Sequence, residues 1–497
     1  MKICFTIAII FLQLMNAAAQ GLPGKRDSLY SEILKENRII QVLLPEDYKP
    51  GSKNKYDVVY LLDGNDNIKL LSQIQQFAEQ EKYIPSFIMV GVFNTDRNRD
   101  LTPTPSKNFS TSGGATNFLS FLKKELLPYI DKKYPTNGEN ILYGHSFGGL
   151  FAMYALLHEP QLFSSYLAVD PSLWWDNGYM NKLAAEKLPA LSGMNKTLYI
   201  SGREGNYPEM GINTMDSVLK EKASADFSWK VIGYENETHN SIKFKSMYDG
   251  LKFAYNGYKM QNEPLVYHPM NGVVLKDSPY IVYCFSNFPV IRYTTNGTAP
   301  TPESGKMERE NSFSGPAVLN IKSFTPKGKY NKDVSGHFIL GEAPTPLARS
   351  DKFKPGGFLY AYYEGKWDHL PDFKKLKSIQ TGITDKDFTF DKFPSKTNFA
   401  CLFEGQLEIK QEGYYIFVLD SDDGAKLYLK TKLIIDYDGV HASNQSQTYL
   451  LPLKKGFYPL RLEYFQKEGG MNLRLRYLPP GSKEPVPIPM EVQYHKK

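Results

Sequence analysis

The feature that most constrains this chain is the hexapeptide at 144–149 (GHSFGG). It follows a short apolar run at 141–143 and opens a helical pattern over 147–158, which ends before Pro160. A strand, a sharp G-x-S-x-G turn and a helix are the context in which a serine stands above a sheet edge as a nucleophile. The backbone N–H of Phe147 lies at the positive end of the new helix, where an oxyanion would form. The stretch therefore predicts a nucleophile elbow with Ser146 at its tip.

The sequence around this elbow alternates between buried strands and amphipathic helices. Apolar runs predict strands at 37–44, 57–62, 87–93, 166–169, 197–201 and 229–234, and the stretch 118–134 has the apolar spacing of a helix. Such alternation implies a mostly parallel sheet with helices on both faces. We therefore expect an α/β fold of the α/β-hydrolase type for residues 20–258.

The first nineteen residues have the composition of a targeting segment. Lys2 precedes an apolar run at 3–15 and the small residues 17–19, which predicts a cleaved signal peptide and a secreted or periplasmic protein. No later stretch is long and apolar enough to predict a membrane span. The net charge of +6 is spread over 497 residues without a basic block, which argues against a nucleic-acid partner. Beyond the leader only Cys284 and Cys401 remain, in different predicted domains, so no disulfide framework is expected.

A serine nucleophile needs a base and donors for the oxyanion. His239 follows the last predicted strand, and the order serine, acid, histidine suits an α/β-hydrolase. His145 is the variable position of the elbow and is expected to point away from the nucleophile, while His158 is expected at a helix end. The second oxyanion donor is expected to be the backbone N–H of Asn65, after the strand at 57–62.

The acid is less well defined by the sequence. It is expected on the loop after the strand at 197–201, where Glu204 is the leading candidate as partner of His239. Three other carboxylates compete with it: Glu209, Asp216 and Asp226. A Ser-His dyad without an acid also stays open.

Residues 30–257 resemble the esterase D family, which includes siderophore trilactone esterases and acyl-polysaccharide esterases. The matching segments are 59–65 (VYLLDGN), 90–92 (VGV), 97–103 (RNRDLTP), 144–149 (GHSFGG) and 171–175 (PSLWW). The resemblance implies ester hydrolysis through an acyl-enzyme with no metal and no organic cofactor. Arg97 and Arg99 are candidates to bind an anionic substrate group, with surface solvation as the alternative. Trp174 and Trp175 are candidates to line the acyl or sugar pocket, with core packing as the alternative.

After residue 258 helical periodicity gives way to short β-type runs. Residues 259–341, with the segment 291–301 (IRYTTNGTAPT), resemble the small immunoglobulin-like domain of chitobiases, and 342–355 reads as a stiff linker. Residues 356–497 resemble the protective-antigen domain family, β-sandwiches that often bind glycans. In some adhesins of this kind an acidic pair holds calcium, a role open to Asp422 and Asp423, although we favour a turn there.

The sequence thus predicts an exported serine esterase that removes acyl groups from polysaccharide- or sugar-linked esters. Its β modules are expected to hold it on or near a polysaccharide. The alternative substrate is a trilactone-type siderophore ester. A hypothesis of another class is a glycan-binding adhesion protein with an inactive hydrolase domain. No cofactor is predicted. The C-terminal module is expected to bind a glycan through tyrosine and tryptophan faces, with Tyr363, Trp367 and Tyr437 as candidates and core packing as the alternative for each.

Overall fold

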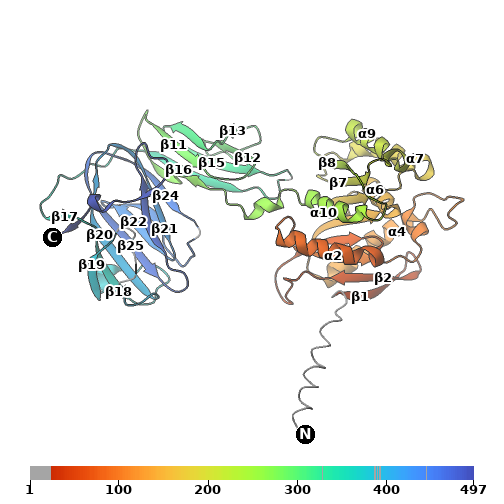
Figure 1. Cartoon of the computed structure of the whole chain (residues 1–497), viewed down its shortest axis with the longest axis horizontal. Coiled ribbons are helices and arrows are strands. Elements are labelled where there is room, and N and C mark those ends of the chain that lie inside the picture. Colours follow the sequence, from red (N-terminus) through yellow and green to blue (C-terminus); the bar gives the residue numbers. More distant parts are fainter. Residues whose placement is uncertain (1–23, 327, 386–387, 389, 391–392, 444) are drawn as a thin grey trace, which may run out of the picture. The chain divides into compact units, whose positions relative to one another are not determined.

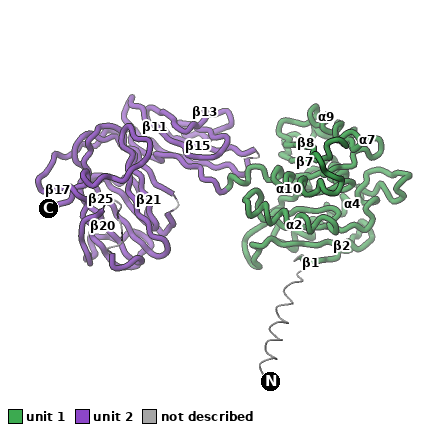
Figure 2. Tube along the Cα trace, viewed as in Figure 1, with its two compact units in different colours: residues 1–261 green, residues 262–497 purple. Residues whose placement is uncertain are grey.

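The structure is a computed structural model that describes residues 24–326, 328–385, 388, 390, 393–443 and 445–497 (Figure 1). The predicted signal peptide at 1–19 lies outside these residues. The chain divides into two compact units, Met1–Gln261 and Asn262–Lys497 (Figure 2). The first boundary is therefore close to the predicted end of the α/β domain at residue 258. The two predicted β modules together form the second unit.

The first unit is built on an eight-stranded sheet of order β1-β2-β4-β3-β5-β6-β7-β8 in the described residues. The strands β3 to β8 run parallel, and β1 and β2 form an antiparallel hairpin at one edge. Its strands are β1 (Lys25–Ser31), β2 (Glu36–Leu43), β3 (Tyr56–Leu61), β4 (Phe87–Val92), β5 (Thr136–His145), β6 (Ser165–Val169), β7 (Thr197–Arg203) and β8 (Ser228–Tyr234). This arrangement confirms the predicted α/β fold.

Helices cover both faces of this sheet. They are α2 (Gly64–Gln80), α3 (Arg97–Leu101), α4 (Ala115–Phe121), η2 (Leu122–Leu126), α5 (Leu127–Lys133), α6 (Phe147–His158), α7 (Trp175–Lys187), η3 (Leu188–Leu191), α8 (Tyr207–Met210), α9 (Ile212–Lys222), α10 (Ile242–Ala254) and η4 (Tyr258–Asn262). Alternate residues of each strand point to opposite faces, so Val58 and Tyr60 of β3 join the core under α4, α6 and α9. Val59 and Leu61 of the same strand join the second core, under α2 and α10. Both faces are thus apolar, and the carboxyl ends of the parallel strands are left to carry the site.

Two local features of this unit differ from the expectation. The predicted helix at 118–134 contains one π-helical turn, η2, between α4 and α5, so it is not a single regular helix. Strand β1 was not predicted because its sequence KRDSLYS is polar and mostly exposed. It pairs with β2 as an edge strand, and its Leu29 packs half-buried against the core.

The second unit consists of β-strands arranged in sandwiches. Its first part has β9 (Tyr267–His268), β10 (Asn271–Val274), β11 (Pro279–Cys284), β12 (Val290–Thr294), β13 (Gly305–Lys306), β14 (Glu310–Ser314), β15 (Ala317–Phe324) and β16 (Asp333–Leu340). The rest has β17 (Phe353–Pro355), β18 (Leu359–Glu364), η5 (Phe373–Lys375), β19 (Gln380–Ile383), β20 (Phe399–Ile409), β21 (Gly413–Ser421), β22 (Ala425–Leu429), β23 (Lys432–Tyr437), β24 (Gln447–Leu453), β25 (Gly456–Gln466), β26 (Leu473–Leu478), β27 (Val486–Pro487), η6 (Met490–Val492) and β28 (Gln493–Lys496). The predicted all-β character of this half is confirmed.

The two predicted β modules share one sheet. Strand β10 pairs in parallel with β16 on one side and with β24 on the other, which joins strands of both modules into a sheet of order β13-β12-β15-β16-β10-β24-β21-β26-β27. A hydrogen bond of 2.8 Å, donated by the backbone N–H of Met270 to Thr448 Oγ1, reinforces the joint. The modules therefore form one body within this unit.

The segment 342–355, expected as a stiff linker, lies against the last module. Leu347 and Phe457 exchange backbone hydrogen bonds of 2.8 and 3.1 Å, and Tyr458 Oη donates to the carbonyl of Pro344 at 3.1 Å. The end of the segment forms β17, which pairs with β28. The segment is therefore part of the structure of this unit, because its backbone groups find partners on the neighbouring sheet.

Within the described residues no helix is long and apolar enough to cross a membrane. Cys284 and Cys401 are both buried and unbridged, and burial raises the pKa of the Cys284 thiol to about 11. Because neither cysteine is bridged, packing of apolar side chains stabilises the two parts of the chain in which they lie.

Candidate active site

The elbow has the strained geometry that its sequence predicts. Ser146 joins β5 to α6 with φ 59° and ψ −116°, a conformation that L-residues rarely adopt. A side chain at Gly144 would overlap the backbone carbonyl of Gly148, and one at Gly149 would come within 3.0 Å of the Pro171 ring. Only glycine at these positions allows so sharp a turn, and the turn is what exposes Ser146 at the carboxyl end of the sheet.

Two helix N-termini meet beside the elbow. Phe147 is the first residue of α6, and Gly64 and Asn65 begin α2, so their N–H groups belong to the helix ends that lack intrahelical partners. The adjacent strands β3 and β5 bring these ends together, and a side chain at Gly148 would lie 3.3 Å from Asp63 Oδ2. The backbone N–H groups of Phe147 and Asn65 therefore lie at the edge where an oxyanion hole is expected.

The acid beside the base is Asp170, and Glu204 is not in contact with it. His239 Nδ1 lies 2.7 Å from Asp170 Oδ2. Asp170 directly follows β6, has φ 41° and is fully buried. Glu204 is exposed and lies beside Gly233 of β8, its backbone N–H donating to the carbonyl of Tyr234 at 3.2 Å. The assignment of Glu204 as the acid is therefore corrected to Asp170.

The other carboxylates considered for this role also lie elsewhere. Glu209 accepts from Asn206 Nδ2 at 2.8 Å, Asp216 pairs with Lys220 at 2.6 Å, and Asp226 accepts from the backbone N–H of Gly193. Asp170 was missed because the chain order of the fold family places the acid after a later strand. The available signal was an aspartate directly after the strand 166–169, beside the elbow strand, since parallel strands deliver their carboxyl-end residues to one edge.

Arg203 at the end of β7 shares this carboxylate. Its Nε donates to Asp170 Oδ2 at 2.7 Å, the same oxygen that faces His239. Burial raises the pKa of Asp170, but the hydrogen bonds from His239 and Arg203 outweigh it and lower the pKa below its ordinary value. Asp170 is therefore ionised at neutral pH, as an acid that stabilises a charged imidazole must be.

His145 supports the loop that carries the base. Its Nε2 lies 2.6 Å from the carbonyl oxygen of His239, and the two imidazole rings have centroids 4.4 Å apart. Burial, with a contribution from His239, lowers the pKa of His145 to about 4. A neutral imidazole that faces a carbonyl with Nε2 must carry its proton there, so His145 donates to the His239 backbone. The elbow histidine, expected to point away from the nucleophile, thus contacts the backbone of the base.

Ser146 Oγ lies 3.4 Å from Ser172 Oγ, and the backbone N–H of Ser172 donates to the carbonyl of Ser146 at 3.2 Å. In the part of the chain that the structure describes, no hydrogen bond joins Ser146 Oγ to His239. Such bonds between nucleophile and base often tighten only when substrate is bound. The two side chains nonetheless come from neighbouring elements, since His145 precedes Ser146 and contacts His239.

The two arginines expected to bind substrate form internal ion pairs. Arg97 donates to Asp63 from Nε at 2.7 Å and from Nη2 at 3.1 Å, and it also donates to the carbonyl of His145 at 3.2 Å. Its guanidinium lies over the Phe147 ring at 5.3 Å. Arg97 thereby ties the start of α2 to the elbow.

Arg99 lies in a separate ionic network away from the elbow. It donates to both carboxylate oxygens of Glu36, at 3.0 and 2.5 Å, and to Asp100 at 2.8 Å. Asp100 in turn accepts from the buried Arg38 at 2.6 Å. These contacts give Arg99 a structural role and leave its expected contact with substrate without support.

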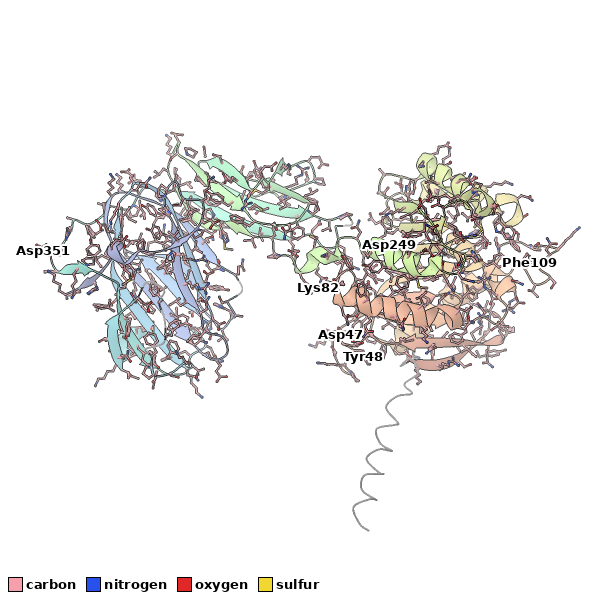
Figure 3. The ribbon with its side chains drawn as sticks, viewed as in Figure 1. Asp47, Tyr48, Lys82, Phe109, Asp249 and Asp351 are labelled. Carbon is pink, nitrogen blue, oxygen red and sulfur yellow. The ribbon has the colours of Figure 1, made fainter. Side chains whose placement is uncertain are left out.

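The two tryptophans divide between surface and core. Trp175 is 1% exposed and donates from Nε1 to Thr104 at 2.9 Å, so it packs in the core. Trp174 is 44% exposed and lies beside Phe147, with ring centroids 6.3 Å apart. Phe109, labelled in Figure 3 on the loop between α3 and α4, contacts both Phe147 and Trp175. An aromatic wall of Phe109, Phe147 and Trp174 therefore flanks the nucleophile.

The acidic turn of the last module is held by backbone and side-chain donors. Asp423 accepts from the backbone N–H groups of Lys467 at 2.7 Å and His441 at 3.3 Å, and Asp422 accepts from that of Ser443 at 3.3 Å. Across the described ranges no group of three or more His, Cys, Asp or Glu side chains is placed to hold a metal ion. These contacts favour the turn over a calcium site.

The aromatic residues suggested for glycan binding are only partly accessible. Tyr363 is buried in a small core with Phe373, Ala400 and Phe465. Trp367 is half-buried against that core, and the Tyr437 ring lies tilted against His441 with centroids 3.7 Å apart. Tyr363 is thus a core residue, whereas Trp367 and Tyr437 are each partly exposed.

Comparison with known proteins assigns both halves of the chain. A family model described as "Putative esterase" matches residues 31–240. Residues 31–240 belong to this esterase family. A second model, the PA14 domain, matches residues 355–490 of the other unit. The resemblances to the esterase D and protective-antigen families are confirmed.

The curated relatives of the esterase unit share about a third of its sequence or less. The chain is 32% identical over 191 residues to the siderophore enterobactin esterase of Emericella nidulans, covering 33% of this chain and 59% of that protein. It is 28% identical over 183 residues to the ferri-bacillibactin esterase BesA of Bacillus subtilis, covering 32% of this chain and 63% of that protein. The chain thus spans less than two thirds of the length of these relatives.

A solved structure of an IroE-like serine hydrolase from Shewanella oneidensis is 35% identical to this chain. The match covers 46% of this chain and 79% of that one, with a TM-score of 0.43.

Proposed function

We propose that the esterase unit hydrolyses carboxylic esters through an acyl-enzyme on Ser146. The observation that carries this proposal is the 2.7 Å contact between His239 Nδ1 and the buried, ionised Asp170, beside a serine held in a strained elbow. Packing alone requires neither the positive φ at Ser146 nor a buried carboxylate against a loop histidine. This argues against the alternative of an adhesion protein whose hydrolase domain is inactive.

In this mechanism the Ser146 hydroxyl attacks the ester carbonyl while His239 Nε2 accepts its proton. Asp170 keeps the proton of the imidazole on Nδ1 and stabilises the imidazolium that forms. The backbone N–H groups of Phe147 and Asn65 stabilise the negative charge of the tetrahedral intermediate. The imidazolium then donates its proton to the departing alcohol, and water attacks the acyl-enzyme by the same route in reverse.

The preferred substrate class is a siderophore ester. The names of the relatives from Emericella nidulans and Bacillus subtilis support this choice. The aromatic wall beside Ser146 supports it chemically, because Trp174 offers an accessible flat face for an aromatic substrate group.

A second candidate is an acylated polysaccharide or other sugar-linked ester, and the PA14 domain favours it. A glycan bound by this module would hold the polymer near the esterase unit and raise the local concentration of its ester groups. In either case the predicted signal peptide would place the enzyme outside the cytoplasm, secreted or periplasmic.

The test compares Ser146→Ala with Ser172→Ala on a short-chain p-nitrophenyl ester. Ser146→Ala should lower kcat by several orders of magnitude with an unchanged melting temperature, while Ser172→Ala keeps the nucleophile and should lose much less. A siderophore trilactone and an acetylated polysaccharide, assayed with the wild type at equal ester concentration, then rank the two substrate classes. Hydrolysis of the aryl ester by Ser146→Ala at the wild-type rate would exclude the proposed mechanism.

A further inference from the structure

One carboxylate oxygen in the esterase unit serves two nitrogen donors. Asp170 Oδ2 lies 2.7 Å from His239 Nδ1 and 2.7 Å from Arg203 Nε. The other oxygen, Oδ1, is buried and has no hydrogen-bond partner among the described residues. The aspartate is therefore oriented by these two side chains and by its own backbone N–H, which donates to the carbonyl of Ser201 at 2.7 Å.

Arg203 adds a fixed positive charge to the catalytic group. Because both nitrogens lie within hydrogen-bond distance of one oxygen, they are separated by no more than twice that distance. The Arg203 side chain is 21% exposed and Asp170 is fully buried, so water screens the pair only partly. A cation so close to an imidazole opposes its protonation, whereas the aspartate alone would favour it.

Two other titratable groups lie near His239. On its β5 side lies His145, which is neutral at neutral pH because burial lowers its pKa to about 4. On its α10 side Lys243 is close enough to lower the pKa of His145, but its side chain is not among those bonded to Asp170. Arg203 is thus the cation that contacts the acid directly.

The alternation of side chains along β7 explains why Arg203 takes this place. Arg203 is the last residue of β7, the strand that pairs with β6, and Asp170 follows β6. Neighbouring residues of an extended chain point to opposite sides, so Arg203 faces Asp170 and Glu204 faces β8. Arg203, the sequence neighbour of the expected acid Glu204, is therefore the partner of Asp170.

We propose that Arg203 is a positioning residue that holds Asp170 for His239 and extends the activity of the enzyme to lower pH. This inference rests on the proposed ester hydrolysis. A triad without the arginine would keep its histidine protonated to higher pH, and such a protonated histidine cannot accept the proton of Ser146. With Arg203 present, the neutral base is available under more acidic conditions.

The experiment measures kcat/KM for a p-nitrophenyl ester from pH 5 to pH 9 in Arg203→Met, Arg203→Lys and the wild type. In Arg203→Met the acid limb of the profile should move up by about one pH unit, and the plateau should fall by about tenfold because Asp170 loses one of its two donors. Arg203→Lys keeps the charge and should restore the acid limb, with a lower plateau because it lacks the planar guanidinium. Lys220→Met, which removes an exposed charge from α9, should leave the profile unchanged.

Two results would overturn the proposal. One is an Arg203→Met profile with a lower plateau but an unmoved acid limb, which indicates a purely structural role. The other is an acid limb that moves equally in Arg203→Met and Arg203→Lys. If Arg203→Met does not fold, Arg203→Gln replaces it, and the pH dependence of Ser146 phosphonylation by a fluorophosphonate gives a second readout. Ser146→Ala is assayed in the same series to separate two kinds of failure. If Ser146→Ala is active, the proposed hydrolysis itself is wrong. If Ser146→Ala is inactive and the acid limb of the Arg203→Met profile is unmoved, only this inference is wrong.

Discussion

Replacing Asp170 by asparagine tests the corrected acid assignment most sharply. The substitution keeps the size of the side chain but removes the charge that lies 2.7 Å from both His239 and Arg203. An amide that turns its NH₂ group toward His239 would demand the wrong imidazole tautomer, and one that turns its oxygen there would still not stabilise the imidazolium. We therefore expect kcat to fall roughly ten-thousandfold, which corresponds to about 5.4 kcal/mol of transition-state stabilisation.

The assay is the steady-state hydrolysis of a p-nitrophenyl ester at saturating substrate and pH 8, with thermal unfolding measured in parallel. Glu204→Gln is the matched control, because Glu204 is an exposed carboxylate one residue after Arg203 and should lose less than threefold. A loss below tenfold in a folded Asp170→Asn would show that the enzyme runs as a Ser-His dyad. A large loss in Glu204→Gln would restore the assignment made from sequence, and either result would refute the reasoning from the structure.

Three further predictions concern the framework. Gly144→Ala should give insoluble or strongly destabilised protein, measured by soluble yield and Tm, because its new methyl group would overlap the backbone carbonyl of Gly148. Glu79→Gln should stabilise the protein at pH 8 by roughly 1–3 kcal/mol and change little at pH 4, measured by urea unfolding. Burial raises the folded-state pKa of Glu79 from 4.5 to about 7, so its contribution to stability is lost as the pH rises from about 4.5 to 7 and stays lost at pH 8. A chain ending after Gln261 should stay soluble and hydrolyse small esters, while one ending near Glu342 should aggregate because β10 would lose its neighbour β24.

Much of the esterase unit could be predicted from its sequence because local pattern and tertiary role agree there. The run 147–158 became α6 with the predicted bounds, and the apolar strands 57–62 and 87–93 became β3 and β4 within one residue at each end. Their two-sided apolar pattern is required by helices on both faces. Strand β1 escaped prediction because edge pairing with β2, and not burial, holds it in place.

The candidate site was only partly predictable, because residues that lie side by side in the site are far apart in the sequence. Ser146 and His239 occupy positions that chain order suggests. Choosing Asp170 over later carboxylates required the strand order, in which β5, β6 and β7 lie side by side. The same holds for Arg97, whose expected role toward substrate gave way to a clamp on Asp63. The shared sheet of the β modules was equally hidden, since the strands β10 and β24 that join it are far apart in the sequence.

The most direct test of the central claim is to locate the reactive serine itself. A fluorophosphonate reacts with an activated serine by forming a phosphorus–oxygen bond with loss of fluoride, and the adduct is identified by peptide mass spectrometry. We expect one adduct per chain, on the peptide that contains Ser146, formed much more slowly in His239→Ala and Asp170→Asn. No adduct on the wild-type protein, or an adduct on Ser172 in place of Ser146, would contradict the account.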